Sequence, residues 1–129
     1  MKRFITLSIL TASLLSCSSN ENTPLSDDII IGKWQLIRQY GDDADDCTKK
    51  STITFENDFD LIINTYLSLT DDECVSTGTT IGNWNKKSEN LYTLEKQGVS
   101  IDTSIRFEDN NNTLIFLESG EEELAYRRK

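Results

Sequence analysis

From residue 29 onward, apolar and polar residues alternate along the chain in short runs rich in β-branched and aromatic side chains. A period of two places every second side chain on the same face of a β-strand. The alternation is clearest in residues 99–108, where one face carries Val99, Ile101, Thr103, Ile105 and Phe107. We predict that this face enters a core and that the opposite, polar face contacts water.

Eight such runs are recognisable, and none has the spacing of an amphipathic helix. They cover residues 29–40, 51–56, 59–69, 74–85, 90–96, 99–108, 113–118 and 122–128. The connections between them are short and rich in Asp, Asn, Gly and Ser, which tolerate turn conformations. Sequential strands joined by hairpins form an antiparallel meander, and closing the meander into a barrel removes its exposed edges. We therefore predict an all-β fold, an antiparallel up-and-down barrel of eight strands.

The segment before the first strand has the layout of an export signal. Lys2 and Arg3 precede an apolar run that ends in Leu14-Leu15-Ser16-Cys17. The run is shorter than the roughly 20 residues that cross a bilayer as a helix, so cleavage is the better interpretation. The last four residues resemble a bacterial lipobox, which implies that Cys17 becomes the lipidated N-terminus. An ordinary signal peptide followed by an incidental Cys is the alternative.

This layout predicts a signal peptide over residues 1–16, a lipidated Cys and flexible tether over 17–28, and one barrel domain over 29–129. The tether is polar, lacks periodicity and holds the only Pro, as flexible linkers often do. An acidic residue soon after Cys17 is similar to the export tags of surface lipoproteins in Bacteroidetes. We expect an outer membrane lipoprotein on the periplasmic or cell-surface face, with its acyl anchor in the lipid bilayer.

Two further cysteines, Cys47 and Cys74, lie in the exported part of the chain, where pairing is the default. A disulfide between them would close a long loop and stabilise a small domain by about 3–4 kcal/mol. The whole chain has a net charge of −9, and removal of the signal takes away two basic residues and no acid. An acidic domain argues against nucleic acid or anionic lipid as a partner and favours cations.

The two ends of the barrel region carry a more specific signature. Gly32-Lys33-Trp34 opens the first strand, and Arg128 shares one face of the last strand with Tyr126. In lipocalins and the wider calycin group, a Gly-x-Trp on the first strand packs against a basic residue of the last strand and closes one end of the barrel. The chain resembles the small lipocalin-like (calycin) domains of Bacteroidetes-type lipoproteins. The resemblance implies barrel closure by Gly32, Trp34 and Arg128, and a second Gly-x-Trp at residues 82–84 also suits the group.

The resemblance implies that a small apolar or amphipathic ligand binds inside the barrel. Eight strands enclose a space that side chains fill or that holds one small molecule. Alternation places the following candidate ligand-contacting residues inside: Leu36, Phe55, Leu61, Ile63, Ile81, Ile101, Ile105, Phe107 and Tyr126. The size of these side chains is consistent with a filled barrel as well as with a hollow one.

Acidic clusters at residues 42–46 and 71–73 each lie just before a cysteine, so the disulfide would bring them to one side of the molecule. Calcium prefers oxygen-rich loops, and we predict a weak calcium site formed by Asp42, Asp43, Asp45, Asp71 and Asp72. The alternative is that these residues are solvated turns that keep the protein soluble. A second hypothesis for function is that the acidic loops bind a cationic protein, as lipoprotein inhibitors of basic lysozymes do on other small β-barrels.

The residues needed for most enzymatic chemistry are missing. The chain contains no His, which excludes the usual zinc sites, His-based acid–base catalysis and Ser-His-Asp arrangements. The six glycines are scattered singly, so no phosphate-binding loop is formed. The acids fall in polar turns and not in apolar surroundings that would raise a pKa to suit a general acid. We expect a monomer without enzymatic activity or cofactor.

Overall fold

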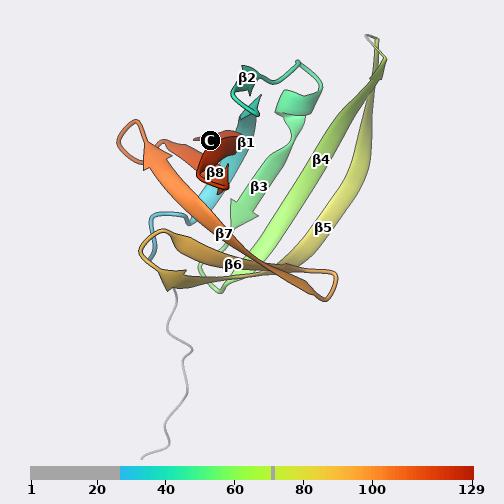
Figure 1. Cartoon of the computed structure of the whole chain (residues 1–129). Helices are drawn as coiled ribbons and strands as arrows, with labels where there is room; N and C mark the ends of the chain where they lie inside the picture. Colours follow the sequence, from blue (N-terminus) through green and yellow to red (C-terminus); the bar gives the residue numbers. More distant parts are fainter. Residues whose placement is uncertain (1–26, 71) are drawn as a thin grey trace, which may run out of the picture.

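In a computed structural model of the chain, the described residues are 27–70 and 72–129. Their backbone forms one antiparallel sheet of nine strands (Figure 1). The strands are β1 (Gly32–Gln39), β2 (Asp42–Asp43), β3 (Thr52–Phe55), β4 (Asp60–Thr70), β5 (Glu73–Ser88), β6 (Leu91–Lys96), β7 (Val99–Glu108), β8 (Thr113–Glu118) and β9 (Glu121–Arg128). A one-turn 3-10 helix, η1 (Thr48–Lys50), precedes β3. Within this part of the chain, no helix has the length and apolar character needed to span a bilayer.

The sheet closes on itself because β1 pairs with both β3 and β9. From β3 to β9, each strand pairs with the next one along the chain. The short β2 adds only to the end of β1, through the pairs Arg38–Asp43 and Gln39–Asp42. The eight longer strands therefore form a closed up-and-down barrel, which confirms the predicted fold class.

The strand bounds differ from the predicted runs mainly at the N-terminal side of the barrel. β1 begins at Gly32 instead of residue 29, because a turn precedes it in which the Ile31 N–H donates to the Asp28 carbonyl at 3.1 Å. β5 continues to Ser88, beyond its predicted end at residue 85. Alternation does not predict β2 or η1, because residues 41–50 are predominantly polar and lack a regular period.

The two ends of the barrel are built from different connections. The closed end carries the β3–β4, β5–β6 and β7–β8 connections together with residues 28–31. The opposite end, termed the mouth, carries the long β1–β3 connection with β2 and η1, and the β4–β5, β6–β7 and β8–β9 hairpins. Figure 1 shows the β4–β5 hairpin extending beyond the other connections.

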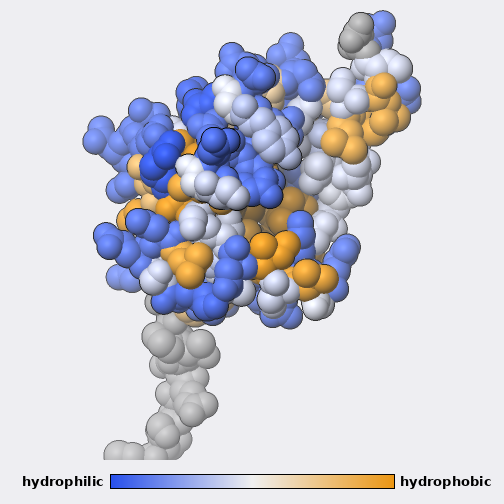
Figure 2. Space-filling model, viewed as in Figure 1, coloured by the Kyte–Doolittle hydropathy of each residue, from blue (hydrophilic) through white to orange (hydrophobic). Residues whose placement is uncertain are grey.

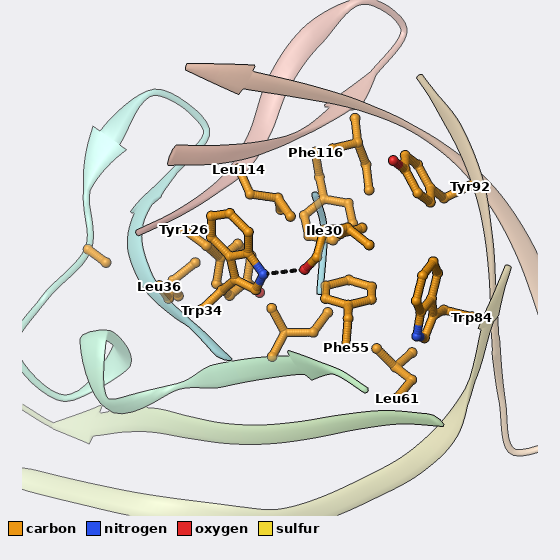
Figure 3. Close-up of a cluster of buried hydrophobic side chains, with 13 residues drawn as sticks. Ile30, Trp34, Leu36, Phe55, Leu61, Trp84, Tyr92, Leu114, Phe116 and Tyr126 are labelled. Carbon is orange, nitrogen blue, oxygen red and sulfur yellow. Dashed lines mark hydrogen bonds between the residues drawn. The ribbon is translucent and has the colours of Figure 1, made fainter. Parts of the chain in front are cut away.

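Large side chains fill the closed end of the barrel (Figure 3). Trp34 and Trp84 enter from opposite walls, with Ile30 and Phe55 between them, and all four are buried. The Trp34 indole N–H donates to the Ile30 carbonyl at 2.7 Å, and the Trp84 indole N–H donates to the Glu56 carbonyl at 2.9 Å. Because buried N–H groups need partners, these two bonds fix both rings against the connections of the closed end.

Asp28 holds the chain at the closed end where it enters the barrel. Its carboxylate accepts hydrogen bonds from the Tyr92 hydroxyl at 2.8 Å and from the Lys86 ammonium at 2.6 Å. The Ile30 backbone N–H donates to the same carboxylate at 3.0 Å. The residues before β1 are thereby joined to β5 and β6.

Arg128, near the end of β9, closes this end of the barrel against the start of β1. Its guanidinium carbon lies 4.1 Å from the centroid of the Trp34 ring. Its N–H groups donate to the backbone carbonyls of Ile29, Ile31 and Asn111. Gly32 has a φ of +132°, and a Cβ at this position would lie 2.9 Å from a guanidinium nitrogen of Arg128. The backbone conformation therefore favours Gly at residue 32, and a Cβ there would displace the Arg128 guanidinium.

Ile81 lies on the outside of the barrel, so its predicted place in the interior was wrong. The residue is 68% exposed and lies opposite Ile62 of β4. Trp84 of the same strand is in the core. Ile81 is three positions before Trp84, and residues an odd number of positions apart point to opposite faces of a strand. The inward position next to Ile81 is occupied by Gly82, where a Cβ would lie 1.9 Å from the Glu95 carbonyl oxygen of β6. Because Gly82 has no side chain, the sequence does not show that residue 82, and not residue 81, points inward.

Replacing Arg128 by Met is expected to lower the free energy of unfolding by about 2 kcal/mol, because the cation–π contact and charged hydrogen bonds are lost. Arg127 is exposed and provides the matched control, for which the Met variant should change stability by less than about 0.5 kcal/mol. Urea denaturation followed by Trp fluorescence measures both values. Equal effects of the two substitutions would contradict a specific role of Arg128 in closure.

Candidate functional site

The mouth half of the barrel encloses a cavity of about 320 Å³. Its walls come from every long strand except β5, together with η1. The apolar part of the lining includes Leu36, Ile53, Ile63, Leu94, Phe116 and Leu124. A concave, largely apolar space with a few polar groups is the usual form of a small-molecule site, for which volumes of about 300–1,000 Å³ are typical.

The cavity exists because inward side chains become smaller from the closed end toward the mouth. On β7, the inward residues Phe107 and Ile105 at the closed end are followed by Thr103 toward the mouth. On β4, the buried Leu61 gives way to Thr65, which lines the cavity. Protein interiors are otherwise close-packed, so these smaller side chains leave a space that the barrel itself does not fill.

The predicted ligand-contacting residues are divided between the two ends of the barrel. Those that line the cavity are Leu36, Ile63, Ile101 and Tyr126. Phe55, Leu61, Ile105 and Phe107 belong to or pack against the core cluster and do not line the cavity, whereas Leu36, Ile63 and Tyr126 do both. The second group supports the walls of the barrel, and only the first group is placed to touch a ligand in the cavity.

Glu123 lines the cavity because of a β-bulge in β9. On β8, Phe116 pairs with Leu124, and the next residue, Leu117, pairs with Glu122. Glu123 is therefore left without a partner on β8. A bulge re-aims side chains relative to simple alternation, and both Glu123 and Leu124 line the cavity. Sequence alternation missed Glu123 for this reason, and no local sequence signal marks the bulge.

Tyr126 brings a hydroxyl group to the cavity wall. The residue is only 7% exposed, and its ring meets Phe116 edge to face with centroids 5.7 Å apart. Burial, and to a lesser extent the negative charge of Glu123, raises the pKa of the Tyr126 hydroxyl to about 12. Within the described residues, this hydroxyl makes no hydrogen bond, yet no fully enclosed side-chain polar atom lacks a partner. The hydroxyl therefore faces accessible space, which the cavity provides.

The predicted disulfide between Cys47 and Cys74 is confirmed. It joins the residue before η1 to the start of β5. The disulfide therefore links the β1–β3 connection to the β4–β5 hairpin at the mouth. Thr48 in η1 and Ser51 after it line the cavity. The Tyr66 backbone N–H of β4 donates to the Ser51 hydroxyl at 2.9 Å. The long β1–β3 connection is thereby fixed as one wall of the mouth.

The rim of the mouth is partly apolar. Four rim residues are about half exposed: Leu67 at 45%, Leu69 at 60%, Val99 at 57% and Ile101 at 48%. Figure 2 shows apolar residues near the end of the β4–β5 hairpin and further apolar groups among the hydrophilic residues of the barrel below it. Apolar side chains around the opening are compatible with the entry of an apolar ligand.

The acidic residues predicted to bind calcium are spread over different local structures. Asp42 and Asp43 form the exposed β2. Hydrogen bonds from Thr48 and then from the Cys47 N–H hold the pKa of the Asp45 carboxyl below its usual value. Across residues 27–70 and 72–129, no three acidic side chains are grouped so as to hold a metal ion. Asp71 lies outside the described residues, and a site that includes Asp71 and Asp72 stays a prediction.

The closed barrel with an internal cavity defines the class of ligand-binding β-barrels. Residues 30–116 match the family of the lipocalin-like domain. The match covers more than half of the chain, so the chain belongs to this family, whose members are generally binding proteins and not enzymes. No curated protein matches the chain.

Replacing both Cys47 and Cys74 by Ser is expected to lower the free energy of unfolding by about 3 kcal/mol, because the disulfide links residues separated by 27 positions. Guanidinium denaturation of the native protein, with and without a reductant, measures this contribution. The reductant should lower the stability of the native protein to that of the double variant. A further effect of the reductant on the double variant would show that the disulfide is not the cause.

Proposed function

We propose that this protein is a lipid-anchored binding protein that holds one small apolar or amphipathic ligand in the mouth half of its barrel. The observation that carries this proposal is the largely apolar cavity of about 320 Å³. The ligand-binding character of the lipocalin-like family supports the same function. The hollow mouth half also favours this function over an inhibitor that acts only through its acidic loops, for which the barrel interior would have no role.

The rigidity of the surroundings supports binding in the cavity. The filled closed end fixes the eight strands, and the disulfide fixes the β1–β3 connection before any ligand arrives. A preformed site does not have to be ordered on binding, so more of the interaction energy contributes to affinity. Burial of apolar ligand surface contributes about 25 cal/mol per Å² to that interaction.

Filling the cavity with a larger side chain tests the proposed site. Thr103 lines the cavity, and the next residue, Ser104, is exposed on the other face of β7. The neutral fluorophore N-phenyl-1-naphthylamine is expected to bind the native protein, and the T103F variant should bind it about tenfold more weakly or not at all. The S104F variant is the matched control and should retain the native affinity. Unchanged affinity in T103F would place the fluorophore outside the cavity.

The lipid anchor is the second part of the proposal. Cys17 and most of the tether lie outside the described residues, and the support comes from the lipobox-like sequence at residues 14–17. The described chain enters the barrel at the closed end, through Asp28 and Ile30. The mouth therefore lies at the end of the barrel opposite to the one where the described chain begins, which would leave it accessible in an anchored protein.

The anchor predicts that Cys17 is the only acylated residue. When the chain is expressed in a Gram-negative host supplied with labelled palmitate, the native protein should take up the label and sediment with membranes. The C17S variant should do neither, because the thioether to the diacylglyceryl group cannot form. The C47S/C74S variant is the matched control and should be labelled like the native protein. Label in the C17S variant would contradict the anchor.

A further inference from the structure

Glu123 is an acidic residue of the cavity wall that pairs with no cation of the described chain. It is half-buried, and across the described residues its carboxylate makes no hydrogen bond or ion pair. The adjacent acid, Glu122, differs in this respect, because it accepts two hydrogen bonds from the Arg38 guanidinium at 2.8 and 3.0 Å. Because no cationic side chain of the described residues contacts this carboxylate, it is available to form an ion pair with a cation bound in the cavity.

Two aromatic rings lie on the wall next to Glu123. Phe116 of β8 and Tyr126 of β9 meet edge to face, and both line the cavity. Aromatic faces attract ammonium groups, most strongly where water is excluded. The Tyr126 hydroxyl, which has no partner within the described chain, can also accept a hydrogen bond from an ammonium N–H. A carboxylate, a phenol oxygen and aromatic faces together form a suitable site for an amine.

The other charged residue on the cavity wall is Lys96, which is exposed at the end of β6. The rim around it is acidic. The β1–β3 connection carries four aspartates and two lysines, and the β8–β9 hairpin adds further glutamates. These residues are Asp42, Asp43, Asp45, Asp46, Lys49 and Lys50 in the connection, and Glu118 and Glu121 in the hairpin. The summed field at the mouth therefore attracts cations and disfavours anions.

We propose that the ligand is a cationic amphiphile whose ammonium group binds to Glu123 and Tyr126 while its apolar tail occupies the cavity. This inference rests on the proposed function and adds the chemical class of the ligand. Leu36, Ile63 and Leu94 provide the apolar surface for the tail. The position of Glu123 in the bulge near the mouth places the charged head at the open end of the cavity, where its remaining hydration is retained.

Three probes with the same tail and different head groups test the proposal: decylammonium, decanol and decanoate. Isothermal titration calorimetry with the mature protein at neutral pH, below the micellar concentration of each probe, measures the three affinities. Decylammonium is expected to bind about tenfold more tightly than decanol, which is the size of one favourable charged contact. Decanoate is expected to bind more weakly than decanol, because its carboxylate is repelled by Glu123.

The E123Q variant identifies the residue responsible, because it removes the charge and keeps the shape of the side chain. Its affinity for decylammonium should fall about tenfold, and its affinity for decanol should stay within about twofold of the native value. E121Q is the matched control, since Glu121 is exposed on the same hairpin and does not line the cavity. E121Q should leave the preference for decylammonium unchanged.

The outcomes separate the ligand class from the proposed function. If none of the three probes binds, the cavity is not a binding site and the proposed function itself is overturned. If the three bind equally, or decanoate binds most tightly, the cavity binds ligands but the cationic class is wrong. If E121Q and E123Q weaken decylammonium binding equally, the charge of the whole rim is responsible, and the specific role of Glu123 is overturned.

Discussion

The pairing of β1 with β9 is the contact on which the rest of the structure depends. This pairing converts an open meander with two free edges into a closed barrel. Both the hydrophobic core and the cavity lie in the interior that closure creates. Arg128 stabilises this pairing at the closed end, because it stacks on Trp34 and binds carbonyls of the segment that precedes β1. The closure therefore joins the first and last strands by side chains as well as by backbone hydrogen bonds.

Filling the closed end allows the mouth half to stay hollow. Trp34, Trp84 and Phe55 bury large apolar side chains in one half of the barrel, and this burial stabilises the fold. A cavity in a small domain is destabilising unless other contacts compensate. Here the disulfide between Cys47 and Cys74 adds stability at the mouth, where packing is least dense. The largest core side chains thus lie away from the cavity, whereas Leu36, Phe116 and Tyr126 both belong to the core cluster and line the cavity.

The sequence predicted the strands, the closure of the barrel and the disulfide, because these depend on local alternation, on the cysteine count and on the Gly32-x-Trp34 signature. It did not predict which end is hollow, since that depends on which inward residues of different strands lie at the same level. The orientations of two residues, Ile81 and Glu123, were also not predicted, and each case has a local cause. Gly82 removes the inward side chain that would have shown Ile81 to point outward, and the bulge in β9 turns Glu123 toward the cavity. Pattern reasoning fails where a strand departs from a strict period of two.

One side of the mouth is fixed by a disulfide bond, and the other side, termed the untied side, is not. The β1–β3 connection and the β4–β5 hairpin are joined by the disulfide, whereas the β6–β7 and β8–β9 hairpins are held by strand pairing and by non-covalent side-chain contacts such as the Arg38–Glu122 ion pair. The two charged residues of the cavity wall, Lys96 and Glu123, both lie on the untied side. A change of charge at either position leaves the closed-end cluster and the disulfide untouched. The selection of a ligand by its charge can therefore vary independently of the stability of the fold.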